Sequence, residues 1–266
     1  MTAAHFFSAA ALGTALLWAA AGAAQETPLC TDRPTKSNFA CTVPRGMIQI
    51  ESDLFSITRA DNGNARSDLL LYTNPTFKYG LTDHSDLEVN IAPLVELRTR
   101  APGVRESRTG VGDLFIRYKH RLTDASAQVQ VSLLPYVKIP LAARGIGNRQ
   151  WEGGIYVPVN IALAPVTLTV VPSLDILADA LDPDDRHVQL TGLVNVGVPL
   201  SPRVTLYAEL WTARNFDPSG TVRQYSADVA LTWLARPNLQ LDVGANFGLN
   251  RATPDVQAYV GLSTRF

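Results

Sequence analysis

From residue 47 to the end of the chain, apolar and polar residues alternate along a series of short segments. The segments 239–250 and 255–266 show the pattern most clearly. In the second of them, Val256, Ala258 and Val260 alternate with the more polar residues between them. A period of two is typical of β-strands that have one apolar face and one polar face. This part of the chain is therefore predicted to be all-β.

Twelve segments of this kind can be placed along the chain. Odd-numbered segments begin every 35 to 40 residues, which predicts a series of β-hairpins. The expected strands are 47–58, 68–81, 87–98, 111–122, 127–139, 153–163, 166–178, 187–200, 204–214, 223–234, 239–250 and 255–266.

The linkers between these segments alternate in length. Short linkers with turn residues, such as 82–86 and 164–165, follow the even-numbered segments. Longer linkers, such as 99–110 and 140–152, follow the odd-numbered segments. Short turns at one end and long loops at the other are typical of transmembrane β-barrels. The sequence thus predicts an antiparallel up-and-down barrel of about 12 strands over 46–266, with both chain ends on the periplasmic side.

Aromatic residues on the apolar face are sorted by height, as expected of a barrel in lipid, which carries rings at both water interfaces. One group is expected near the periplasmic rim and the other near the opposite rim. The first group is Tyr79, Tyr118, Trp233 and Phe266, and the second is Trp151, Tyr225 and Phe247.

Four prolines interrupt the alternation. A proline lacks the N–H that a strand ladder needs, so we expect bulges or bends at these positions, or else split strands and a different strand count. The residues are Pro75, Pro93, Pro135 and Pro172.

Composition excludes two classes of protein. Hydrophobic residues make up 46% of the chain and charged residues 18%, against roughly 25% charged residues in soluble domains. Beyond residue 24 no run approaches the ~18 apolar residues of a membrane-spanning helix, which excludes a helical membrane protein. With 23 basic and 24 acidic side chains the net charge is −1, so a nucleic-acid binder with a broad basic surface is not expected.

The first residues predict export. Residues 1–24 have an apolar stretch followed by small residues, as a cleaved signal peptide has, and we expect cleavage after Ala23 or Ala24. The segment 25–45 is then a periplasmic N-terminal segment. Its two cysteines, Cys30 and Cys41, are expected to form a disulfide, because an exported chain meets an oxidising compartment.

Three stretches resemble a known family. They are Tyr79-Gly80-Leu81-Thr82-Asp83, Gly110-Val111-Gly112-Asp113-Leu114-Phe115 and Val137-Lys138-Ile139-Pro140-Leu141. They look like the outer-membrane transporters of the phenol-degradation meta-pathway family, and the resemblance covers most of the mature chain. It implies a barrel in the outer membrane of a Gram-negative bacterium that passes small hydrophobic or aromatic compounds. It supplies no catalytic residues.

Catalytic and metal-binding patterns give no strong candidate. His84 is expected in a turn, His187 at a loop edge and His120 on the apolar face, and none has a Ser or Cys partner at a recognisable spacing. His120 is the one candidate for a lipid-cleaving enzyme of the outer membrane. The acidic group at 182–185 offers oxygen ligands for calcium, but a solvated loop is the preferred interpretation. No catalytic residue, cofactor or metal is therefore expected.

The polar face of the strands is expected to line the lumen. Charges there require water inside the barrel or extensive pairing. The charged residues are Glu51, Asp53, Lys78, Glu88, Glu96, Arg98, Asp113, Arg117, Lys119, Arg121, Lys138, Asp175, Glu209, Asp228, Asp242 and Arg265. The aromatic residues are Phe55, Tyr72, Phe115, Tyr136, Tyr156, Tyr207, Trp211 and Tyr259, which either bind flat solutes or simply fill the interior.

In a closed ring of twelve strands, Arg117 and Lys119 are expected to face Asp228 across the lumen. This arrangement either creates a transverse field that orients a solute or pairs the groups and holds the lumen shut.

The sequence therefore predicts a channel for passive or facilitated passage of small organic solutes. The expected partners are outer-membrane lipid, the solutes themselves and the barrel-assembly machinery, which would bind the last strand ending in Phe266. Two alternatives remain: a lipid-modifying barrel enzyme, and a structural or sensory barrel plugged by residues 25–45.

Overall fold

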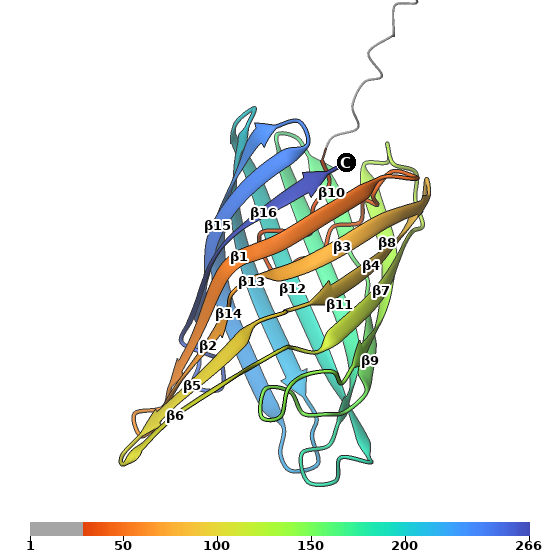
Figure 1. Cartoon of the computed structure of the whole chain (residues 1–266). Coiled ribbons are helices and arrows are strands. Elements are labelled where there is room, and N and C mark those ends of the chain that lie inside the picture. The colour runs from red at the N-terminus through yellow and green to blue at the C-terminus, as the bar shows by residue number, and fades with distance from the viewer. Residues whose placement is uncertain (1–28) are drawn as a thin grey trace, which may run out of the picture.

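The computed structural model describes residues 29–266, which form a closed antiparallel β-barrel (Figure 1). The first strand pairs with the last, from Gln49 opposite Arg265 to Arg59 opposite Val256, and this pairing closes the wall. Among the described residues no helix is long and apolar enough to span a membrane. The signal peptide expected at 1–24 lies outside the described residues.

The barrel wall consists of sixteen strands. They are β1 (Ile48–Asp61), β2 (Arg66–Leu71), β3 (Asn74–Thr82), β4 (Ser85–Ile91), β5 (Val95–Ala101), β6 (Val104–Gly110), β7 (Leu114–Arg121), β8 (Val129–Ile139), β9 (Glu152–Tyr156), β10 (Val159–Leu163), β11 (Val166–Ala178), β12 (Arg186–Ser201), β13 (Val204–Asn215), β14 (Val222–Arg236), β15 (Leu239–Gly248) and β16 (Val256–Arg265).

The chain runs from one end of the barrel to the other twelve times, as the sequence predicts, and we call each passage a crossing. Eight crossings are single strands, and four consist of two consecutive strands: β2 with β3, β4 with β5, β6 with β7, and β9 with β10. Proline accounts for part of the splitting, because Pro93 lies between β4 and β5 and Pro158 between β9 and β10. By contrast, Pro135 and Pro172 lie inside the continuous strands β8 and β11. The prolines therefore split some strands without changing the number of crossings.

The linkers follow the predicted alternation in length only in part, because the β1–β2 loop (62–65) is shorter than the β7–β8 connection (122–128) at the other end. Every even crossing before the last is followed by a connection at the end that carries the C-terminus, and all of these except 122–128 have two residues (Figure 1). The linker 99–110, which we expected to be a loop, is instead part of the β5–β6 hairpin, whose strands pair from Val95–Gly110 to Ala101–Val104. This hairpin projects to one side of the barrel at the opposite end (Figure 1). Within the described chain, β6 pairs with a strand on one side only.

Residues facing outward are apolar and exposed, as a lipid-facing surface requires. The rings expected at the two rims are all on this exposed face: Tyr79, Tyr118, Trp233 and Phe266 at one end, and Trp151, Tyr225 and Phe247 at the other.

A β-bulge in β1 turns outward two residues that the sequence predicts in the lumen. The register shifts between Asp53 and Phe55, so Phe55 pairs with the exposed Val260 and faces outward. Tyr72 packs against Phe55, with ring centroids 5.8 Å apart, and hydrogen-bonds Glu96. The predicted inward placement of Phe55 and Tyr72 is therefore wrong, because strict alternation does not survive a bulge.

Candidate functional site

Residues 29–45, which we call the plug, lie inside the barrel near the end that carries the C-terminus (Figure 1). Their contacts reach wall strands far apart in the sequence: the backbone N–H of Val43 donates to Asp86 in β4, and that of Ser37 donates to Glu209 in β13. The described part of the segment expected in the periplasm thus occupies the lumen. Cys30 and Cys41 are joined by a disulfide within it.

One side of the plug is acidic and meets two lysines of the wall. The carboxylate of Asp32 accepts hydrogen bonds from Lys78 in β3 and from Lys119 in β7, the latter at 2.7 Å. Both lysines are almost fully buried. Burial alone would raise the pKa of Asp32, but the two ammonium groups outweigh it and hold that pKa well below its usual range. Asp32 is therefore ionised inside the barrel.

The wall itself completes the pairing of these lysines. Lys78 lies 2.7 Å from Glu51 and 3.6 Å from Glu88, and Lys119 lies 3.3 Å from Glu88. A buried charge is tolerated only when it is paired and hydrogen-bonded. The network therefore needs the plug, since Asp32 is the nearest carboxylate to Lys119.

The other side of the plug is basic and meets an acidic wall. The two terminal nitrogens of Arg33 lie 2.6 Å from Asp53 in β1 and 2.6 Å from Asp242 in β15. Burial lowers the pKa of Arg33, but its bonds to Asp242 and Asp53 more than offset this and raise that pKa. Lys36 lies 2.6 Å from Asp228 in β14. Asp32 and Arg33 are adjacent, so the plug presents charges of both signs to neighbouring parts of the wall, where β1 and β3 are paired strands.

This arrangement changes the predicted role of the lumen charges. Lys119 and Asp228, which the sequence predicts to face each other across the lumen, do not do so across open water. Each is paired with a plug residue of opposite charge, Asp32 and Lys36 respectively. The plug's charged residues were missed as site residues, because nothing local marks which wall strand a short polar segment will meet.

The predicted lumen aromatics separate into two groups. Tyr207, Trp211 and Tyr259 contact the plug: Tyr207 packs on Phe39 at 6.2 Å, Lys36 lies 5.2 Å above the ring of Trp211, and Arg33 lies 5.8 Å above that of Tyr259. These rings therefore hold the plug.

The second group is a cluster of Phe115, Tyr136 and Tyr156. The rings of Tyr136 and Tyr156 stack at 5.3 Å, and Phe115 lies 6.2 Å from Tyr136. The Tyr136 hydroxyl donates to Asp175 at 2.7 Å. The ring contacts and the hydrogen bond of this cluster all join residues of the wall.

Arg117 and Arg121 differ from the two lysines. The guanidinium of Arg117 lies 5.3 Å above the ring of Phe115, and within residues 29–266 no carboxylate comes within 4.0 Å of it. Arg121 donates to the backbone carbonyls of Thr123 and Asp83 at the short-turn end. Arg117 thus lies against an aromatic ring of the wall, whereas the two lysines lie against carboxylates.

Cavities remain beside the described part of the plug. One, of about 550 Å³, lies at the short-turn end and is lined by plug residues including Phe39 and by wall residues including Asn160 and Tyr207. The other, of about 160 Å³, is lined by Asp32, Arg33 and Arg117 among others. The plug therefore leaves part of the lumen unfilled.

Residues 31–266 match the model of the family described as "Putative MetA-pathway of phenol degradation". The chain belongs to this family. The match covers the plug as well as the barrel, so the segment from residue 31 onward is part of the family's architecture. Among curated proteins, none matches this chain.

Solved structures share the architecture. The COG4313 outer membrane channel from Pseudomonas putida F1 aligns with a TM-score of 0.68 and 15% identity, covering 85% of this chain and 98% of that one. The translocator domain of autotransporter NalP from Neisseria meningitidis aligns with a TM-score of 0.54 and 14% identity, covering 84% and 90%. The NanC porin aligns with a TM-score of 0.51 and 8% identity, covering 82% and 98%. These similarities show the fold, that of outer-membrane β-barrels.

The one enzymatic candidate in this member of the phenol-degradation family lacks support from geometry. His120 pairs across the strands with Ser85 and stacks on Tyr118 at 6.2 Å. The Ser85 hydroxyl, however, hydrogen-bonds Thr82. Among the described residues, no hydrogen bond joins His120 to a serine or a carboxylate, which a nucleophilic serine would need.

Proposed function

We propose that this protein is a gated channel in the outer membrane of a Gram-negative bacterium, with the plug as its gate. The observation that carries the proposal is the chemistry of the contact between plug and wall. Its strongest contacts are ion pairs and hydrogen bonds, made by Asp32, Arg33 and Lys36. Water can replace such contacts when the plug moves, whereas a plug held by a large apolar core would have no comparable partner in an open, hydrated lumen.

The solute class follows from the free aromatic cluster and from the family. Phe115, Tyr136 and Tyr156 present rings to the lumen, and rings of this kind stack against flat organic solutes. The family is described by a phenol-degradation pathway. We therefore assign small organic solutes, aromatic ones in particular, to passive or facilitated passage through this lumen.

Conductance in a planar lipid bilayer tests the gate. The wild-type protein is compared with a variant carrying Asp32→Asn, Arg33→Gln and Lys36→Gln. We expect brief or small openings from the wild type and longer or larger ones from the variant. A matched control removes three charges outside the lumen, Asp61→Asn, Arg100→Gln and Arg105→Gln, and should conduct like the wild type.

The outcomes separate the alternatives. Silence from both the wild type and the plug variant, in protein shown to be folded, favours the structural barrel and rejects the channel. Hydrolysis of the bilayer lipid would instead favour the enzyme. Equal conductance of the plug variant and the wild type would reject the plug as the gate.

Solute preference is tested by permeation into liposomes. In the plug variant, replacing Phe115 and Tyr136 with Ala should slow the entry of phenol relative to glycerol, because the stacking surface is lost. Loss of both rates in equal proportion would argue against aromatic recognition.

A further inference from the structure

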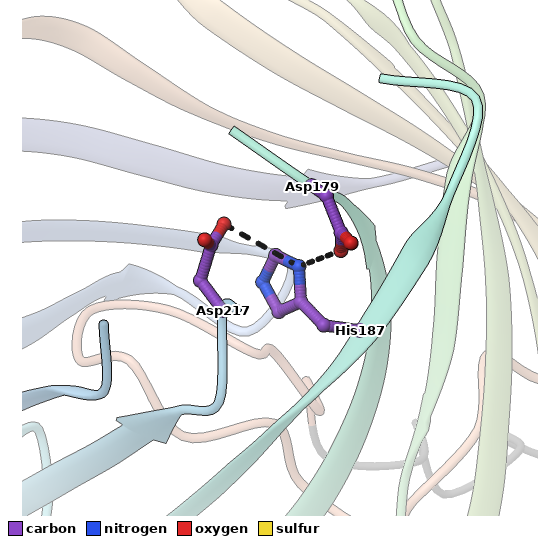
Figure 2. Close-up of side chains that lie close together, drawn as sticks. All are labelled: Asp179, His187 and Asp217. Atoms are coloured by element: carbon purple, nitrogen blue, oxygen red, sulfur yellow. Dashed lines mark hydrogen bonds and ion pairs between the residues drawn. The ribbon is translucent and has the colours of Figure 1, made fainter. Parts of the chain in front are cut away.

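Three potential metal ligands meet outside the plug and its contacts. Asp179, His187 and Asp217 each place a ligand atom within 4.8 Å of the others (Figure 2). Nδ1 of His187 lies 2.7 Å from an Asp179 oxygen and 3.5 Å from an Asp217 oxygen. Figure 2 shows the imidazole between the two carboxylates. The site joins the β11–β12 loop, the start of β12 and the β13–β14 loop, at the end of the barrel opposite the plug.

Backbone hydrogen bonds hold the two loops in place around this cluster. The N–H of Ala180 donates to Asp217 at 2.9 Å, so the first loop already binds the carboxylate of the second. The N–H of Ser219 also donates to Asp217, at 2.7 Å. In the first loop, the N–H of Asp179 donates to the carbonyl of Asp185 at 3.1 Å. The three side chains are therefore positioned by secondary structure and tight loops rather than by flexible segments.

The buried polar atoms of the cluster are not all hydrogen-bonded. His187 and Asp179 are each only 8% exposed. Nε2 of His187 is fully buried and has no hydrogen-bond partner among the described residues. Two carboxylates converge on one imidazole in a largely buried place, and buried carboxylates that lie close together are unfavourable without a compensating positive charge. Nδ1 is the nitrogen that faces both carboxylates, so an ion held here would be bound by Nδ1 and by one oxygen of each carboxylate.

We propose that Asp179, His187 and Asp217 bind a divalent transition-metal ion, of which Zn²⁺ is the representative. One imidazole nitrogen and two carboxylate oxygens suit Zn²⁺, whereas Ca²⁺ takes six to eight oxygen ligands and no nitrogen. The acidic group at 182–185 does not contribute, so this site differs from the calcium loop considered from the sequence. The ion ties two neighbouring loops together at the mouth opposite the plug.

Direct binding of the metal alone tests the site. Tag-free protein is stripped with a chelator and titrated with ZnCl₂ and with CaCl₂ by calorimetry. We expect one Zn²⁺ per chain and much weaker binding of Ca²⁺. His187→Gln and Asp217→Asn should each weaken Zn²⁺ binding at least about tenfold, the scale of losing a group that holds a metal site.

Matched controls keep the result specific. Asp184→Asn removes an acid from the same loop, and His84→Gln removes a histidine from the other end of the barrel; both should bind Zn²⁺ like the wild type. Thermal unfolding provides a second measurement: Zn²⁺ should raise the midpoint of the wild type and of both controls but not that of His187→Gln.

Two results would overturn the assignment. One is Zn²⁺ binding by His187→Gln that equals that of the wild type. The other is the absence of stoichiometric Zn²⁺ binding by folded wild-type protein. Neither measurement depends on conductance, so failure of this site leaves the proposed channel untouched, and the reverse is also true.

Discussion

Asp32 and Lys119 lie 87 residues apart in the sequence and form an ion pair 2.7 Å long inside the barrel. Lys119 is 1% exposed, and its other carboxylate neighbour, Glu88, is shared with Lys78. The pair therefore couples the position of the N-terminal segment to the charge of a wall strand.

Reversing one charge of this pair should release the plug. Asp32→Lys places three ammonium groups together, and breaking one buried ion pair costs about 3–5 kcal/mol. We expect the plug of this variant to become accessible to protease in folded barrels. Adding Lys119→Asp to the same chain should restore much of the protection, because the pair is re-formed in the opposite sense. Failure of the double variant to recover any protection would show that the two residues act independently.

The disulfide should limit how far the plug can unfold. Cys30 and Cys41 are 11 positions apart, and a loop of this size contributes up to about 3 kcal/mol. In Cys30→Ser with Cys41→Ser, we expect faster hydrogen exchange in residues 29–45 and unchanged exchange in the strands. Mass spectrometry of the non-reduced wild type checks the bond itself, and free thiols on both residues would contradict it.

The topology predicts which ends of the strands are accessible on cells. A tag inserted between Pro102 and Gly103, at the tip of the β5–β6 hairpin, should be labelled on intact cells. A tag at Asp124, in the turn between β7 and β8, should be labelled only after the outer membrane is permeabilised. Labelling at Asp124 alone would reverse the orientation of the barrel.

Arg117 should set ion preference once the plug has moved. Its guanidinium has no carboxylate within 4.0 Å among the described residues, whereas Lys119 is neutralised by its neighbours. In the plug variant, Arg117→Glu should shift the reversal potential in a salt gradient toward cation selectivity, because a ring or patch of charge sets ion preference in a pore. Arg121→Gln is the control and should leave the potential unchanged, since Arg121 bonds backbone carbonyls at the turn. An unchanged potential in conducting Arg117→Glu would remove this residue from the solute path.

The sequence by itself determined the wall of this protein. Alternation with a period of two gives the strands, and linkers of unequal length give the antiparallel hairpins and their ends. Both are local signals, because neighbouring strands in an up-and-down barrel are also neighbours in the chain. The four crossings that consist of two strands keep the same order around the barrel. Prolines such as Pro93 therefore do not change the number of crossings.

Only the tertiary structure decided what fills the interior of the barrel. Arg33 meets Asp242 across 209 positions and Lys36 meets Asp228 across 192, and no periodicity in the sequence specifies such pairs. The same holds for Phe55, which a bulge turns outward, and for His187, which meets Asp217 only because two loops lie side by side. Pairing of charges depends on distance in space, and that distance is fixed only when the barrel closes with the plug inside.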